Sequence, residues 1–165
     1  MTVGDSRRFD LFAKVAARNF PPESFTKVAD VAGGKGYLQL ALRQQGYSDV
    51  TTFDKRNKRS RLKGTVFRHR FFGSEIKDSF DLILGMHPDE ATDVIIVEAI
   101  RRRVPFIICP CCIMPTVRPF WGQHKYQNWL SHLKGLAEKA DFRVQQTSLQ
   151  MTGRNIVLIG RPGKL

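Results

Sequence analysis

The chain alternates between segments whose apolar residues recur every three to four positions and short segments that are apolar almost throughout. The first pattern predicts helices, and the second predicts strands that are buried on both faces. The predicted helices span residues 5–19, 37–45, 89–103 and 124–139. The predicted strands span residues 25–31, 50–53, 65–72, 80–84, 106–109, 142–149 and 155–159.

Strands alternate with helices through most of the chain, an order typical of a parallel sheet covered by helices on both faces. The turn Thr152-Gly153-Arg154 separates the last two strands, so we expect an antiparallel hairpin at one edge of the sheet. We therefore predict an α/β fold with a mostly parallel, seven-stranded sheet. The 165 residues suit one domain. Its parts are an N-terminal helix in 1–22, a core in 23–113, and a C-terminal helix and hairpin in 114–165.

The composition fits an ordinary globular protein, because 42% of the residues are hydrophobic and 25% are charged. We find neither an apolar run long enough to cross a bilayer nor a signal-peptide pattern, so we expect a soluble, cytoplasmic protein without a membrane partner. The three cysteines lie within residues 109–112, which excludes a disulfide framework. We expect no metal, because no second pair of Cys or His residues stands at ligand spacing.

Positive charge is the strongest bias in the composition. The formal net charge is +12 and the isoelectric point is about 10.1, so polyanions, and nucleic acid above all, are the favoured partners. The charge is densest in the segment KRNKRSRLK at 55–63, and the three arginines at 101–103 add to it. A solvated loop that contacts no nucleic acid is the alternative. The residues expected to contact RNA, through phosphates or by stacking on a base, are Lys58, Arg59, Arg61, Lys63, Arg118 and Trp121.

A glycine-rich turn, Asp30-Val31-Ala32-Gly33-Gly34-Lys35-Gly36, joins the first predicted strand to the next helix. Glycines in this position allow positive φ and let a ligand approach the backbone closely. The dinucleotide fingerprint requires a third glycine where Gln39 stands, and the Gly-Lys-Ser/Thr of a P-loop is absent.

Asp54 ends the second strand, where a carboxylate can accept hydrogen bonds from both hydroxyls of a ribose. An aspartate that only caps a turn is the alternative.

The acid at the strand end and the glycine turn resemble the first motif of class I S-adenosylmethionine-dependent methyltransferases. Ala32 stands where that family often has its first glycine. In the family, the acid and the loop backbone hold the methionine part of the cofactor. The resemblance implies a Rossmann-like methyltransferase fold with S-adenosylmethionine as cofactor. The cofactor-binding residues that it implies are Asp30, Ala32, Gly33, Gly34, Gly36, Tyr37, Asp54, Lys55, Phe71, Met86 and His87.

Two further segments, GMHPDEATD at 85–93 and Pro110-Cys111-Cys112, resemble a particular group of methyltransferase domains. That group carries L-H-A-C-[DG]-x-A-T-D after the fourth strand and P-C-C after the fifth. It includes tRNA 2′-O-methyltransferases that act on the acceptor stem. The His of that motif falls on Met86 and its Cys on Pro88, so the roles of those two residues do not carry over. The resemblance covers about residues 27–113.

His87 and Asp89 follow the fourth strand, whose carboxyl end faces the transferred methyl group in this fold. His87 is therefore a candidate general base near neutral pH. The alternative is that it caps the turn or contacts the cofactor without proton transfer. Asp89 is a second candidate, and it is equally suited to cap the following helix. Cys111 or Cys112 could attack a pyrimidine ring as a nucleophile, or simply form part of the pocket wall.

Together these features predict an S-adenosylmethionine-dependent methyltransferase that acts on structured RNA such as tRNA or rRNA. A protein partner could supply specificity, since the sequence shows no separate RNA-recognition domain. Two alternatives remain open: a non-catalytic binding module that keeps the fold, and a methyltransferase for a small molecule or a protein.

Overall fold

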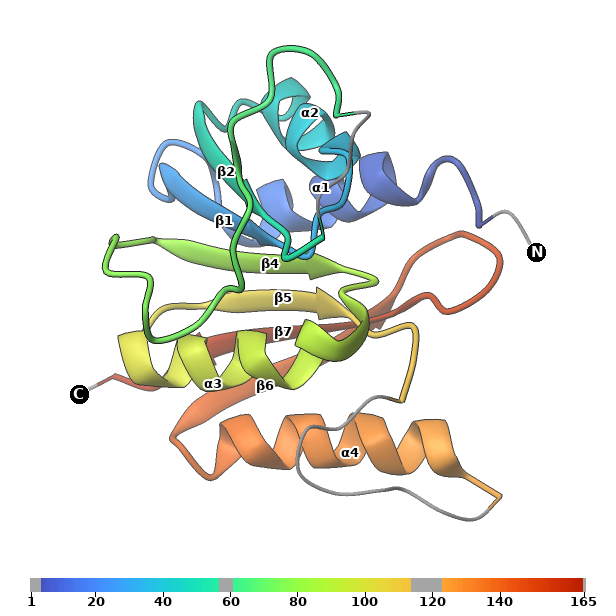
Figure 1. The fold of residues 1–165 in the computed structure, drawn as a ribbon. Coiled ribbons are helices and arrows are strands. Elements are labelled where there is room, and N and C mark those ends of the chain that lie inside the picture. Colours follow the sequence, from blue (N-terminus) through green and yellow to red (C-terminus); the bar gives the residue numbers. More distant parts are fainter. Residues whose placement is uncertain (1–3, 57–60, 114–122, 165) are drawn as a thin grey trace.

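The computed structural model describes residues 4–56, 61–113 and 123–164. Helices and strands alternate along the chain as the sequence predicts (Figure 1). The helices are α1 (Arg8–Asn19), α2 (Tyr37–Gln44), α3 (Thr92–Arg102) and α4 (Lys125–Glu138), and a short 3-10 turn, η1 (Asp89–Ala91), precedes α3. The strands are β1 (Lys27–Val31), β2 (Asp49–Phe53), β3 (Phe67–Arg68), β4 (Leu82–Met86), β5 (Phe106–Cys109), β6 (Phe142–Ser148) and β7 (Ile156–Pro162).

The strands form one seven-stranded sheet in the order β3-β2-β1-β4-β5-β7-β6. The five strands from β3 to β5 run parallel to one another, whereas β7 runs antiparallel to both β5 and β6. The fold class is thus confirmed, including the antiparallel hairpin at one edge. The strand order reverses between β1 and β4, and open α/β sheets bind ligands at such a point, beyond the carboxyl ends of the strands.

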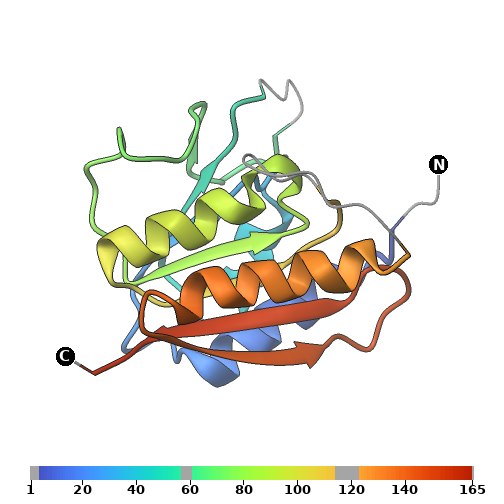
Figure 2. The same ribbon diagram turned by 90° about the horizontal axis from the view of Figure 1, so that it is seen from below.

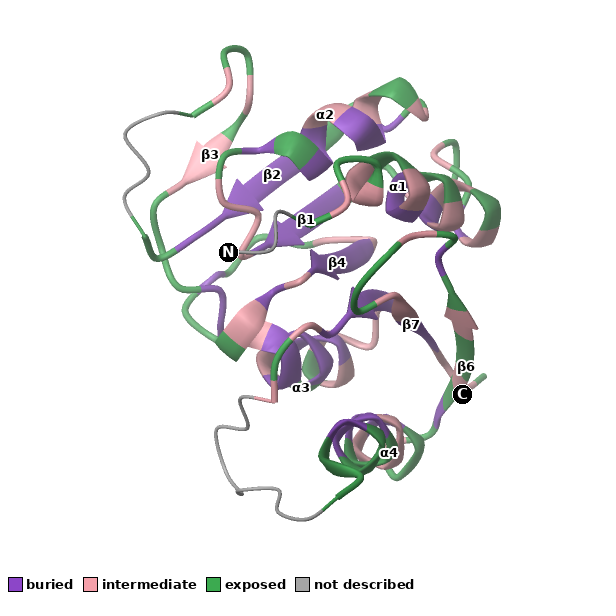
Figure 3. Cartoon of the chain, turned by 90° about the vertical axis from the view of Figure 1, so that its right-hand side faces the viewer, coloured by how far each residue is buried: buried purple, intermediate pink, exposed green. Residues whose placement is uncertain are grey.

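Two helices cover each face of the sheet. Helices α1 and α2 pack on one face, and α3 and α4 pack on the other (Figures 1 and 2). Neighbouring residues of a strand enter opposite cores: Leu82 joins the core under α1 and α2, and Ile83 joins the core under α3 and α4. The central strands are therefore buried on both sides (Figure 3), which explains their continuous apolar runs.

Most predicted bounds lie within three residues of the observed ones, and two of the differences change the local structure. The strand expected over 65–72 is only two residues long, because the backbone N–H of Arg70 donates to the carbonyl of Arg68 and turns the chain away from β2. The helix expected from residue 89 begins at Thr92, after η1. The expectation that Asp89 caps this helix is wrong, since the N-cap position is Ala91.

Among the described residues, no helix combines the length and the apolar character that a membrane crossing requires.

Candidate functional site

Two adjoining pockets lie beyond the carboxyl ends of β1, β2 and β4. The larger, of about 310 Å³, is bordered by the glycine turn, the start of α1 and the end of β4. The smaller, of about 50 Å³, lies between the end of β2 and η1. Ten of the predicted cofactor residues line these pockets. The larger is lined by Asp30, Ala32, Gly33, Gly34, Tyr37, Met86 and His87. The smaller is lined by Asp54, Lys55 and Phe71, together with Ala32.

Asp30 is a fully buried carboxyl group that borders the larger pocket. Its Oδ2 accepts a hydrogen bond from the Thr52 hydroxyl at 2.8 Å, whereas its Oδ1 has no hydrogen-bond partner among the described residues. Burial raises the pKa of Asp30 to about 7, and the nearby charge of Asp54 adds to this. A buried carboxylate oxygen without a donor is costly. Asp30 is therefore suited to receive a donor or a cation from a ligand in the pocket.

Gln39 holds this arrangement in place from α2. The side chain is fully buried, and its Nε2 donates to the Thr52 hydroxyl and to the carbonyl of Val66, each at 2.8 Å. Its Oε1 accepts from the backbone N–H of Val66 at 2.7 Å. Gln39 stands where a dinucleotide fingerprint has its third glycine. From this position its side chain supports Asp30 through the hydroxyl of Thr52.

The glycines of the turn are required for different reasons. A Cβ atom at Gly33 would lie 2.1 Å from Oδ2 of Asp30, so only glycine fits beneath that carboxyl group. Gly34 and Gly36 have φ values of +60° and +96°, which favour glycine. Gly36 lies at the N-terminus of α2, where a Cβ atom would press on Thr65. At Gly34 a Cβ atom would meet no described atom within 4 Å, because it would point into open space.

Asp54 directly follows β2, at the place that the sequence predicts, but Arg56 already engages its carboxylate. Oδ1 accepts from the backbone N–H and the Nε of Arg56, and Oδ2 accepts from Nη2 of Arg56 and from the backbone N–H of Gly34. Burial alone would raise the pKa of Asp54, but these donors lower it below its ordinary value. Arg56 borders both pockets, so its side chain stands where the two meet.

His87 lies at the end of β4 with φ of 53° and lines the larger pocket. Its Nε2 is 2.8 Å from the carbonyl oxygen of Arg154. A carbonyl can only accept, so Nε2 carries the proton and Nδ1 is left as a hydrogen-bond acceptor. Burial lowers the pKa of His87 below its usual value, which favours the neutral imidazole.

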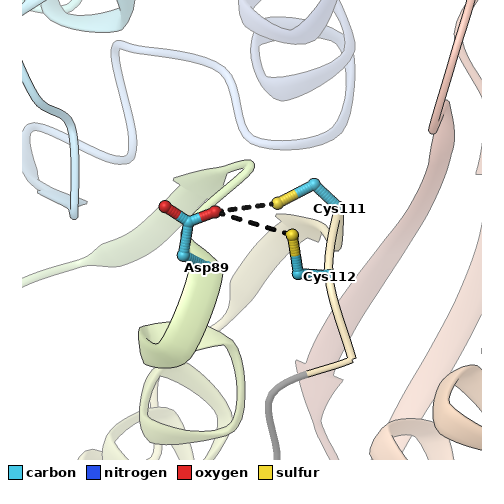
Figure 4. A group of neighbouring side chains, drawn as sticks. All are labelled: Asp89, Cys111 and Cys112. Atoms are coloured by element: carbon cyan, nitrogen blue, oxygen red, sulfur yellow. Dashed lines mark hydrogen bonds between the residues drawn. The ribbon is translucent and has the colours of Figure 1, made fainter. Parts of the chain in front are cut away.

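Asp89 faces the cysteines that follow β5 (Figure 4). The thiol of Cys111 donates to Oδ1 of Asp89 at 3.1 Å, and the thiol of Cys112 lies 3.9 Å from the same oxygen. Burial, reinforced by Asp89, raises the pKa of the Cys111 thiol, so it is a poor nucleophile as it stands. The sequence offers no second pair of Cys or His ligands, but the fold brings a carboxylate to the two thiols.

The residues expected to contact RNA are only partly visible, because Lys58, Arg59, Arg118 and Trp121 lie outside the described residues. Lys63 is exposed, and the guanidinium of Arg61 lies 3.5 Å from the centre of the Phe67 ring. Leu62 donates its backbone N–H to the carbonyl of Lys35, which places this loop beside the glycine turn.

The three arginines at 101–103 make contacts within the protein. Arg101 and Arg102 both pair with the carboxylate of Glu98. Arg102 also donates to the carbonyls of Ile76 and Asp78, each at 2.6 Å. Arg103 donates to two further carbonyls, near the start of β6 and at the end of β7. Arg102 and Arg103 thus connect elements of the fold, whereas Arg101 pairs within α3.

Several residues of the pockets are not among those predicted from the sequence, and Arg8, Phe9 and Arg56 are the most prominent. Arg8 and Phe9 belong to α1, and Phe9 stacks on Tyr37 with ring centres 5.6 Å apart. The sequence of α1 shows only an amphipathic helix, so nothing in it indicates a role at the pocket. Arg56 belongs to the basic segment at 55–63. Its position two residues after Asp54 is the feature of the sequence that could have indicated its contact with that carboxylate.

No family model matches the chain, and no curated protein matches it in sequence. Solved structures match it in fold. A ribosomal protein L11 methylase from Lactobacillus delbrueckii subsp. bulgaricus superposes with a TM-score of 0.68 at 15% identity, over 98% of this chain and 81% of that one. Human N-acetylserotonin methyltransferase in complex with S-adenosylmethionine superposes with a TM-score of 0.60 at 16% identity, over 95% of this chain and 51% of that one.

A third match is a chain of a complex that contains the Haloferax volcanii Trm112 methyltransferase activator. It has a TM-score of 0.64 at 15% identity, over 96% of this chain and 91% of that one. At such identities the likeness concerns the fold alone. The chain has the Rossmann-like fold of methyltransferases, as the sequence predicts.

Proposed function

We propose that the protein is an S-adenosylmethionine-dependent methyltransferase. The observation that carries the proposal is Asp30, a buried carboxyl group that borders the larger pocket at the strand-order reversal. Its Oδ1 has no donor among the described residues. The ammonium of the cofactor's methionine part would supply the missing donor. Similar folds in solved methyltransferases, one of them in complex with S-adenosylmethionine, support the proposal.

The described residues fit the parts of this cofactor. Asp30 and the backbone of the glycine turn would hold the methionine part, and the open space at Gly34 leaves room for it. Asp54 would hold the ribose hydroxyls. The smaller pocket, with Phe53 and Phe71 in its wall, would take the adenine. When bound, the cofactor supplies an activated methyl group on a sulfonium.

Arg56 must change its contacts for this cofactor to bind at Asp54. It uses three of the four hydrogen bonds that the Asp54 carboxylate accepts, and the fourth comes from Gly34. A carboxylate offers about four acceptor sites, so ribose hydroxyls would have to replace the guanidinium. Asp89, which lies 3.7 Å from Nη1 of Arg56, is a second partner for the displaced side chain.

The acceptor side of the site is the segment after β4. There, His87 lines the larger pocket, and its Nδ1 would be the hydrogen-bond acceptor for the group to be methylated. We propose structured RNA as the substrate, because the net charge of +12 favours a polyanion. A protein partner could supply specificity, and a chain of similar fold occurs in a complex with the Haloferax volcanii Trm112 methyltransferase activator.

Calorimetric titration with S-adenosylmethionine tests the cofactor. We expect Gly34→Ala to weaken binding at least tenfold, because the new methyl group enters the space proposed for the methionine part. Gly153→Ala is the matched control. Gly153 also has positive φ, +84°, and no described atom within 4 Å of an added Cβ, so both variants carry a similar backbone cost of roughly 1–2 kcal/mol.

The control should bind S-adenosylmethionine as tightly as the unmodified protein. Absence of binding to the unmodified protein would refute the cofactor assignment, and so would equal affinities in the two variants. Circular dichroism of both variants establishes that each remains folded.

A further inference from the structure

Asp89, Cys111 and Cys112 form a cluster of metal-ligating side chains at the carboxyl ends of β4 and β5. Their ligand atoms, one carboxylate oxygen and two sulfurs, all lie within 4.8 Å of one another. Figure 4 shows both thiols turned toward the carboxylate, although adjacent residues in an extended chain would point to opposite sides. The loop after β5 thus presents two sulfurs to a carboxylate that comes from 22 residues earlier in the chain.

The spacing of these atoms is close to that of a zinc site. With Zn–S bonds of about 2.3 Å and a Zn–O bond of about 2.1 Å, tetrahedral geometry separates the ligand atoms by roughly 3.6 to 3.8 Å. The sulfurs of Cys111 and Cys112 lie 3.1 and 3.9 Å from Oδ1 of Asp89. Shifts of about 0.5 and 0.3 Å would bring these two sulfur–oxygen distances to the roughly 3.6 Å expected for zinc ligands.

The backbone around Asp89 aims the carboxylate at this loop. Asp89 has a φ of 49°, in the left-handed region, and begins the η1 turn. The Thr92 hydroxyl holds this turn by donating to the carbonyl of Asp89 at 2.7 Å. Cys111 is half-buried and Cys112 is exposed, so an ion can reach the cluster from solvent.

The surrounding charge also suits a bound cation with two thiolates. Two thiolates and one carboxylate carry one more negative charge than a divalent cation neutralises. Nη1 of Arg56 lies 3.7 Å from Oδ2 of Asp89, the oxygen that the thiols do not use. The guanidinium would balance the remaining negative charge and leave Oδ1 for the metal.

We propose that Asp89, Cys111 and Cys112 bind a thiophilic divalent cation such as Zn²⁺. Binding forms two metal–sulfur bonds and one metal–oxygen bond, and the two S–H protons pass to solvent. No electron is transferred. Three protein ligands leave a fourth tetrahedral position for water or another ligand, as in catalytic zinc sites. Cation binding does not require S-adenosylmethionine, so either proposal can fail while the other holds.

Cobalt titration of the full chain tests the site. The protein is stripped with a chelator, kept reduced with a phosphine, and titrated with Co²⁺, whose thiolate complexes absorb strongly in the near ultraviolet. We expect a charge-transfer band with the intensity of two thiolates, which Zn²⁺ abolishes by displacing cobalt. Cys111→Ser and Cys112→Ser should each lose about half of the band. Asp89→Asn should keep both thiolates but weaken cobalt affinity at least tenfold.

Cys109→Ala is the matched control, because Cys109 is fully buried on β5 and lies outside the cluster. It should retain the full band. The proposal is overturned if the unmodified protein shows no thiolate band at a large excess of Co²⁺, or if Cys111→Ser and Cys112→Ser both keep the full band. The first of these results needs no variant, so a substitution that fails to fold cannot rescue the proposal.

Discussion

At the scale of single residues, Asp30 lowers the stability of the folded protein at neutral pH, although it is the proposed partner of the cofactor's ammonium. Its carboxyl group would ionise near 3.8 in an unfolded chain but holds its proton to about pH 7 in the folded protein. Between these values the unfolded state releases a proton that the folded state keeps. Stability therefore falls as the pH rises from about 4 to 7 and stays lower above that range.

Asp30→Asn should remove this loss, because an amide has no proton to release. We expect the variant to gain stability over the unmodified protein as the pH rises. The gain should level off above pH 7 at an upper bound on the order of 4 kcal/mol. Urea unfolding at pH 5 and pH 8 measures the difference. S-adenosylmethionine binding should be weakened in the variant, since the partner of its ammonium is lost. Equal stability differences at the two pH values would contradict this account of Asp30.

At the scale of elements, Arg102 connects the end of α3 to the segment before β4. Its guanidinium donates to Glu98 and to the carbonyls of Ile76 and Asp78, and its side chain is only 10% exposed. Arg102→Ala would leave these acceptors without their donor. We expect a loss of roughly 2–4 kcal/mol in the free energy of unfolding, measured with urea.

Arg101→Ala is the control for this prediction. Arg101 belongs to the same helix turn and pairs with the same carboxylate, but its side chain is 46% exposed. An exposed pair of this kind contributes about 1 kcal/mol or less. Similar losses in the two variants would mean that the carbonyl contacts of Arg102 add little to stability.

At the scale of the whole molecule, the charge of +12 predicts salt-sensitive binding to RNA. We expect the triple serine variant of Lys58, Arg59 and Lys63 to bind a structured RNA more weakly. Its dependence on salt concentration should also be flatter, by about 0.7 to 0.9 in logarithmic slope for each lost phosphate contact. Arg61 stays unchanged because it packs on Phe67.

The control for the RNA prediction removes the same amount of charge elsewhere. Its three lysines lie on or directly after α4 and in the C-terminal tail: Lys134, Lys139 and Lys164. Titrations at several salt concentrations compare the two triple variants with the parent. If both triple variants lose RNA affinity equally, RNA binding depends on the net charge, and the loop makes no specific contribution to it. If neither loses affinity, the loop does not track a phosphate backbone.

The sequence by itself determined the layered architecture and the place of the pockets. Helical and strand periods are local properties, and a strand buried on both faces must be apolar throughout, as at 82–86 and 106–109. The acid and the glycines after the first strand are also a local signal. A tight turn against a ligand needs those residue types in consecutive positions, so the sequence alone predicts the turn.

Only the tertiary structure decided which side chains meet. Arg102 reaches carbonyls 24 and 26 residues away, and Asp89 meets thiols 22 and 23 residues away. Gln39, which the sequence marks only as a missing glycine, supports Asp30 through Thr52. These partners are brought together by strand order and by helix packing across the sheet. The spacing of apolar residues within one segment does not predict these contacts, because that spacing is the same whichever strands become neighbours in the sheet.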